Sequence, residues 1–191
     1  MKKLRKTTLD ELAKKMPVLS ENEQRSSIGG YRYYDESGQF IDQIGSSNEI
    51  RFINRCYYDS TVMNGSSESL ISQSSSFSDG TPLAREGAVR QIAANLGISI
   101  QPLYGESTTR NGECDGKACY INMNSTRVNG GNFYDIGLIA IHEKCHLDNH
   151  YNTGVLKPEA EAYKAMMQHS YFDYASPSYQ NHIANQYNKH K

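Results

Sequence analysis

The sequence predicts an α+β domain in which a small mixed or antiparallel sheet packs on one central helix. Three observations predict this class. Short segments of strand character, each bounded by turn residues, occur early in the chain and again before residue 125. Residues 136–141 form an apolar run, as in a helix that is buried on most of its sides. A second helix is expected close behind it over 157–167.

The elements before the central helix are marked by their turns and caps. Glu36-Ser37-Gly38 is a hairpin signal between two short strands. Thr81 is expected to cap a helix that has Pro82 at its first position and ends at Gly97. The other expected elements are strands over 31–35, 39–44, 49–58, 98–104 and 118–124, and a serine-rich loop over 65–79.

The central helix carries a His-Glu-x-x-His motif at residues 142–146. Residues four apart lie on one helix face about 6 Å from each other, so His142 and His146 can bind one metal ion. Glu143 borders the same face, where it can hold an attacking water and accept its proton. The motif therefore predicts a zinc site with an adjacent general base. The alternative is a helix with solvated histidines and no metal.

This segment resembles the zincin metallopeptidases over about residues 119–170. The resemblance implies a zincin-like domain that holds Zn²⁺, uses Glu143 as the catalytic base and acts on a peptide or protein substrate. Zincins commonly run an edge strand beside the substrate, and residues 118–124 are the candidate, with an ordinary interior strand as the alternative. The resemblance also implies a residue that stabilises the oxyanion, and the candidates are Tyr163, His169, Tyr151 and Tyr174.

A catalytic zinc ion usually has three protein ligands, so a third one is expected. The longer zincin motif with a glycine and a third histidine does not fit, because Asn149 and Asn152 occupy those positions. His150 continues the histidine spacing, but on a straight helix it lies about 12 Å of rise beyond His142. One metal ion does not readily bind both of these histidines.

Glu159 is the preferred third ligand. It shares an apolar stripe of the expected helix with Tyr163 and Met166, and a carboxylate in such a stripe must be neutralised or bound. It also matches the first glutamate of the Glu-x-x-Ala-Asp/Tyr helix of those zincins that take a glutamate as third ligand. Glu161 and His150 are the alternatives, as is a surface Glu159 that interacts only with the helix dipole.

Residues 1–30 resemble a double-glycine leader of the kind found on bacteriocin-like precursors, especially those of Bacteroidetes. The matching residues are Leu19, Ser20, Glu23 and the pair Gly29 and Gly30, whereas Gln24 departs from the pattern. The resemblance implies that the peptidase domain of an ABC exporter cleaves after Gly30 and that residues 31–191 are secreted, to the periplasm or the medium. Two glycines let an extended backbone enter a narrow protease cleft. The alternative is an N-terminal helix with a flexible linker.

Composition narrows the class of partner. The 20 basic and 21 acidic residues give a net charge of −1, which offers no reason to expect nucleic acid or an anionic membrane surface. No apolar run approaches the roughly 18 residues of a membrane span. The basic N-terminus has no apolar core behind it, so a Sec signal is not expected.

The cysteines suit an exported chain. Cys114 and Cys119 bracket an Asp-Gly turn and are expected to meet across a hairpin in an oxidising space. Cys145 lies inside the metal motif and is expected to be a packed thiol, with a Cys56–Cys145 bridge as an open alternative.

The expected function is therefore that of an exported zinc metallopeptidase. The alternatives are a bacteriocin-like or adhesive secreted protein that acts by binding, with a structural metal or none, and a peptidase toxin against competitors. A change at Glu143 separates hydrolysis from binding.

Overall fold

Two small sheets and seven α-helices make up residues 31–63, 67–153 and 158–191, which are the residues that the structure, a computed structural model, describes. The predicted α+β class is confirmed. The N-terminal elements are β1 (Arg32–Tyr34), β2 (Phe40–Gln43), β3 (Ile50–Phe52), α3 (Arg55–Met63), α4 (Ser67–Gln73) and β4 (Ser75–Ser76). The middle elements are α5 (Pro82–Asn95), β5 (Ile100–Leu103), β6 (Gly112–Cys114), β7 (Cys119–Asn122) and α6 (Thr126–Asn129). The C-terminal elements are α7 (Phe133–Thr153), α8 (Glu159–Gln168), the 3₁₀-helix η1 (Ser170–Tyr174) and α9 (Pro177–His190).

The N-terminal sheet has the strand order β2-β1-β3-β4. The predicted hairpin is confirmed, since β1 and β2 pair antiparallel around the turn at Gly38. This glycine has a φ of 79°, and a Cβ on it would lie 2.3 Å from the backbone oxygen of Ala84. The hairpin turn therefore packs directly on the backbone of α5, which joins this sheet to the rest of the molecule.

The expected strand over 49–58 is correct only in its first part. The strand β3 ends at Phe52, and residues from Arg55 onward form α3. The side-chain oxygen of Asn54 accepts a hydrogen bond from the backbone N–H of Tyr57 at 3.1 Å, as a helix cap does. The aromatic residues that favoured a strand instead face a small core, in which Tyr58 is 4% exposed. Capping and burial thus outweigh the β propensity of this segment.

The expected loop over 65–79 is also corrected, because it contains α4 and β4. Leu70 is 1% exposed and packs into the same small core as Tyr33 and Tyr58. Burial of Leu70 favours an ordered helix here, although serine itself favours turns. By contrast, the expected helix after Thr81 is confirmed. The Thr81 hydroxyl accepts the N–H of Ala84 at 3.2 Å, and Pro82 begins α5.

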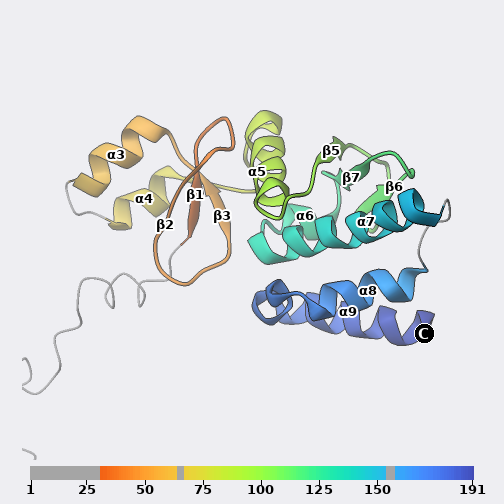
Figure 1. Cartoon of the computed structure of the whole chain (residues 1–191). Coiled ribbons are helices and arrows are strands. Elements are labelled where there is room, and N and C mark those ends of the chain that lie inside the picture. Colours follow the sequence, from red (N-terminus) through yellow and green to blue (C-terminus); the bar gives the residue numbers. More distant parts are fainter. Residues whose placement is uncertain (1–30, 64–66, 154–157) are drawn as a thin grey trace, which may run out of the picture.

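The second sheet has the order β5-β7-β6 and lies against α7 (Figure 1). The predicted strands over 98–104 and 118–124 are confirmed as β5 and β7. The expectation that 118–124 forms the edge strand is wrong, because β7 lies between β5 and β6 and pairs with both. One edge of this sheet is the short strand β6 (Gly112–Cys114), which is antiparallel to β7.

The helix α7 is the centre of the larger core. It lies between the β5-β7-β6 sheet with α5 on one side and the pair α8 and α9 on the other (Figure 1). Ile136, Leu138, Ile139 and Ala140 are at most 1% exposed, so the predicted burial of this helix on most of its sides is confirmed. Within the described ranges, no helix has both the length and the apolar character that crossing a membrane requires.

Asp135, in the first turn of α7, fixes the chain that leads into α9. Its carboxylate is 2% exposed and accepts hydrogen bonds from the N–H and the hydroxyl of Ser176 at 2.8 and 2.6 Å. The guanidinium of Arg127 lies 3.3 Å away and completes the pairing. This carboxylate thus connects the start of α7 to the segment before α9. The helix α9 contributes to one wall of the site described below.

Replacing Asp135 by Asn should lower the free energy of unfolding by about 3 kcal/mol, because a buried charge pair and its hydrogen bonds are broken. Urea denaturation monitored by circular dichroism measures this change. Asp173→Asn is the matched control, since Asp173 is exposed in η1, and it should change the unfolding free energy by less than about 0.5 kcal/mol. Equal effects of the two substitutions would contradict a stabilising role for Asp135.

Candidate metal centre

The two histidines of the motif face each other on α7, one helical turn apart. Their Nε2 atoms are 3.2 Å apart, and their ring centroids are 4.8 Å apart. The side chains of His142 and His146 are 12% and 8% exposed. The spacing of four residues on a helix brings them together, and the apolar run before them buries the helix that carries them.

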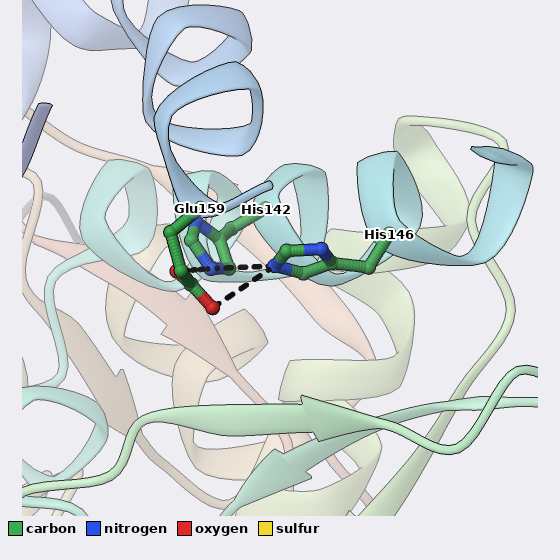
Figure 2. A group of neighbouring side chains, drawn as sticks. All are labelled: His142, His146 and Glu159. Atoms are coloured by element: carbon green, nitrogen blue, oxygen red, sulfur yellow. Dashed lines mark hydrogen bonds and ion pairs between the residues drawn. The ribbon is translucent and has the colours of Figure 1, made fainter. Parts of the chain in front are cut away.

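Glu159 reaches the same point from the first residue of α8. Its Oε2 lies 3.2 Å from Nε2 of His142, and its Oε1 lies 3.4 Å from Nε2 of His146. Figure 2 shows the carboxylate beside the two facing rings, with dashed lines that join its oxygens to them. Hydrogen bonds to His142 and then His146 hold the pKa of Glu159 well below its usual range, so this carboxyl group is ionised at neutral pH.

The alternatives for the third ligand fare differently. Glu161 is exposed on α8 and is not part of the group formed by the two histidines and Glu159. His150 lies in α7, two helical turns beyond His142, and its side chain is outside the described side chains. Of the three residues considered from the sequence, the structure thus brings Glu159 to the paired imidazoles.

The donor atoms of this group suit a tetrahedral metal ion. One nitrogen or oxygen from each of the three residues lies within 4.8 Å of the others. Zinc binds imidazole nitrogen and carboxylate oxygen at about 2.0–2.2 Å, so two ligands of a tetrahedral ion lie about 3.3–3.6 Å apart. Here the two Nε2 atoms are 3.2 Å apart, and two different oxygens of Glu159 lie 3.2 Å from His142 and 3.4 Å from His146. His142, His146 and Glu159 therefore match zinc in donor type, and their donor atoms lie close enough together to share one ion.

Glu143 lies beside this group and packs against β6. Its side chain is 5% exposed, and burial raises its pKa to about 8. A Cβ on Gly112 would lie 2.8 Å from Oε1 of Glu143, so only a glycine leaves room for the carboxyl group at this point. Glu143 is thus placed in a confined position next to the three donor atoms.

A cavity of about 490 Å³ opens over His142, His146 and Glu159. One wall is β6 with the segment before it, and the other is formed by α8 and α9. Asn122, 1% exposed, organises the first wall, because its amide donates to the backbone oxygens of Ser107 and Arg110 at 2.6 and 2.8 Å. The lining residues are Thr109, Arg110, Asn111, Gly112, Glu113, Cys114, Ile139, His142, Glu143, His146, Glu159, Tyr163, Tyr179, His182 and Gln186.

Of the tyrosines and histidines considered for oxyanion stabilisation, only Tyr163 is a described residue that lines this cavity. Its ring centroid lies 4.7 Å from that of His142. His169 instead accepts the N–H of Tyr171 at 3.1 Å, and Tyr174 is 60% exposed and stacks on Tyr134. The side chain of Tyr151 lies outside the described side chains.

His182 is a cavity residue that the sequence reasoning missed. It projects from α9 beside the rings of Tyr163 and Tyr179, with centroids 6.5 and 5.9 Å away. Burial lowers its pKa, so the ring is neutral at neutral pH. The sequence does contain a signal for this residue. Pro177 marks the start of a helix, and Tyr179, His182 and Gln186 follow it at the spacing of one helix face.

Comparisons with models of protein families, with curated proteins and with solved structures give no match. The functional assignment that follows therefore depends on the geometry of this site and on the sequence motif.

Proposed function

We propose that residues 31–191 form a zinc-dependent peptidase in which His142, His146 and Glu159 hold the metal and Glu143 is the general base. The observation that carries the proposal is the convergence of three donor atoms within 4.8 Å of one another, beside a buried glutamate in an open cavity. A structural zinc ion usually has four protein ligands and no cavity. Three ligands with an adjacent carboxyl group instead favour catalysis over a purely structural metal.

In this proposal, each residue has a definite task. Zinc, when bound, activates water for attack and polarises the carbonyl group of the substrate. Glu143 would accept the proton of the attacking water and pass it to the leaving amine, because the positive charge of a bound metal ion would lower its raised pKa and leave the carboxylate ionised. Tyr163 and His182 line the opposite wall, where they can donate hydrogen bonds to the carbonyl oxygen as negative charge develops on it. Burial raises the pKa of Tyr163 to about 12, which keeps its hydroxyl a donor.

The free edge of β6 supports a peptide as the substrate. The N–H of Asn122 donates to the oxygen of Asn111 at 2.9 Å, and hydrogen-bonded pairs alternate along an antiparallel ladder. The backbone groups of Gly112 and Cys114 therefore point away from β7. No other described strand pairs with this edge, which borders the cavity. An extended peptide can add to such an edge through main-chain hydrogen bonds.

The purified protein should contain about one zinc ion per chain by mass spectrometry of the metal, and it should cleave an unfolded protein substrate. A chelator should abolish the cleavage, and added zinc should restore it, because activation of the water depends on the ion. Chromatography–mass spectrometry of the products measures the number of peptide bonds cut. Protein without bound zinc after growth with zinc, or cleavage that survives the chelator, would contradict the proposal.

We also propose that residues 1–30, which lie outside the described residues, are a leader removed on export. Co-expression with a peptidase-containing ABC exporter should yield a secreted chain whose intact mass matches a protein that begins at Tyr31. Gly30→Val should block this cleavage, because a branched side chain does not fit a cleft shaped for glycine. Lys15→Ala, far from the cleavage point, is the control. Equal processing of the Gly30 variant and the control would argue against a leader.

A further inference from the structure

The cavity wall formed by β6 contains two cysteines that the strand register places face to face. Cys114 ends β6, Cys119 begins β7, and the two are direct partners in the antiparallel ladder. Cys114 lines the cavity, whereas Cys119 is fully buried. Neither the proposed metal group nor the proposed base uses these thiols.

The register gives this pair the geometry of a disulfide site. Asn111 and Asn122 form a hydrogen-bonded pair, so the alternation of the ladder makes Cys114 and Cys119 a non-hydrogen-bonded pair. The Cα atoms of such pairs are about 4.5 Å apart, and disulfides span Cα separations of about 4.4–6.8 Å. Because the two residues are direct partners, their side chains also lie on the same face of the sheet.

The loop between the two strands holds this register. The side-chain oxygen of Asp115 accepts the N–H groups of Lys117 and Ala118 at 2.8 and 2.9 Å. Gly116 adopts a φ of 80°, which favours glycine. The two cysteines, which are free thiols in this structure, are therefore held as direct partners before any bond forms.

The other cysteines are placed less favourably. Cys56 is exposed on α3, and Cys145 is half-buried on α7. The helix α3 and the second half of α7 lie at opposite ends of the molecule (Figure 1). The structure therefore does not support a Cys56–Cys145 bridge, which the sequence had left open.

We propose that Cys114 and Cys119 form a disulfide bond that fastens the β6 wall of the cavity to the interior of the sheet. Gly112, which contacts Glu143, lies two residues before Cys114 on the same short strand. The bond thus limits the movement of the strand against which Glu143 packs. This inference does not depend on zinc binding or on peptidase activity.

The bond forms by thiol–disulfide exchange with a small disulfide such as oxidised glutathione. The thiolate of Cys114, which is reachable from the cavity, attacks one sulfur of the oxidant and releases one glutathione. The thiolate of Cys119 then attacks the Cys114 sulfur of this mixed disulfide and releases the second glutathione. Two protein thiols are oxidised, one oxidant molecule is reduced to two thiols, and the two protons pass to the released glutathiones.

Peptide mapping tests the connectivity directly, because Lys117 lies between the two cysteines. The full-length protein is incubated with oxidised glutathione, alkylated while unfolded, and cut with trypsin without reduction. The expected product is one species in which peptides 111–117 and 118–127 are joined, and reduction separates it. Two separately alkylated peptides, or a linkage of either cysteine to Cys56 or Cys145, would overturn the proposal.

Thermal unfolding supplies a second measurement. Closing a loop of this size should raise the melting temperature of the oxidised protein by about 4–8 °C relative to the reduced protein. Cys56→Ser should keep this difference, whereas Cys114→Ser and Cys119→Ser should each remove it. If Cys119→Ser fails to fold, the more accessible Cys114→Ser gives the same comparison. A difference that survives Cys114→Ser would overturn the proposal. All melting temperatures are measured in the presence of a chelator, so that bound metal does not contribute to them. The test of the disulfide is then independent of the test of the metal site.

Discussion

Glu143→Gln should lower the rate of peptide hydrolysis by about 10²–10⁴-fold while zinc content stays at that of the unchanged protein. An amide cannot accept the proton of the attacking water, and general acid–base catalysis contributes about this factor. Glutamine has nearly the same shape as glutamate, so it fits the confined space beside Gly112. The rate is measured with a quenched fluorescent peptide selected from the cleavage products, and the zinc content is measured on the same preparation.

Glu113→Gln is the matched control, because Glu113 also lines the cavity but is 41% exposed and lies next to Gly112 on β6. Its loss should change the rate by no more than a few-fold, since its interaction with Arg110 is exposed to solvent. If the Glu143→Gln variant hydrolyses the peptide at the rate of the unchanged protein, Glu143 is not the general base. Loss of zinc together with activity would show instead that Glu143 supports the metal site rather than the proton transfer.

The local pattern of the sequence was sufficient to predict that His142, His146 and Glu159 lie together. The spacing of His142 and His146 and the apolar stripe of Glu159 both follow from helical periodicity, which depends on neighbouring residues. The helices α5, α7 and α8 were predicted for the same reason. The position of Glu159 beside the histidines also depends on how α8 packs against α7, which periodicity alone does not determine.

The parts that were not predicted depend on contacts between distant segments. The strand β6 has three residues, Gly-Glu-Cys, with no alternation to mark it, and its place at the edge of the sheet is set by pairing with β7. The helix α4 forms because Leu70 is buried by Tyr33 and Tyr58, which lie elsewhere in the chain. His182 joins the cavity only because α9 packs on α8. Strand order and helix docking of this kind are set by the tertiary structure.

Substituting two glutamates of α8 in turn, and comparing the zinc affinities of the two variants, tests the identity of the third ligand. Glu159→Gln should weaken zinc binding by at least about 100-fold, beyond the roughly 10- to 100-fold that changes outside the ligand shell cause. The carboxylate of Glu159 lies 3.2 and 3.4 Å from the two imidazole nitrogens, and its lowered pKa keeps it ionised for the metal. Competition with a chromophoric chelator at neutral pH measures the zinc affinity.

Glu161→Gln makes the same change of charge two residues later, in the same first turn of α8. Both substitutions remove a favourable interaction with the helix dipole, which is worth about 0.3–1 kcal/mol at exposed positions. If Glu159 only stabilised the helix, the two variants would lose stability to a similar extent, and neither would change the zinc affinity. A loss of affinity confined to Glu159→Gln therefore requires that this carboxylate binds the metal. Equal affinities in both variants would exclude Glu159 as a ligand and leave His150 as the remaining candidate among the residues considered.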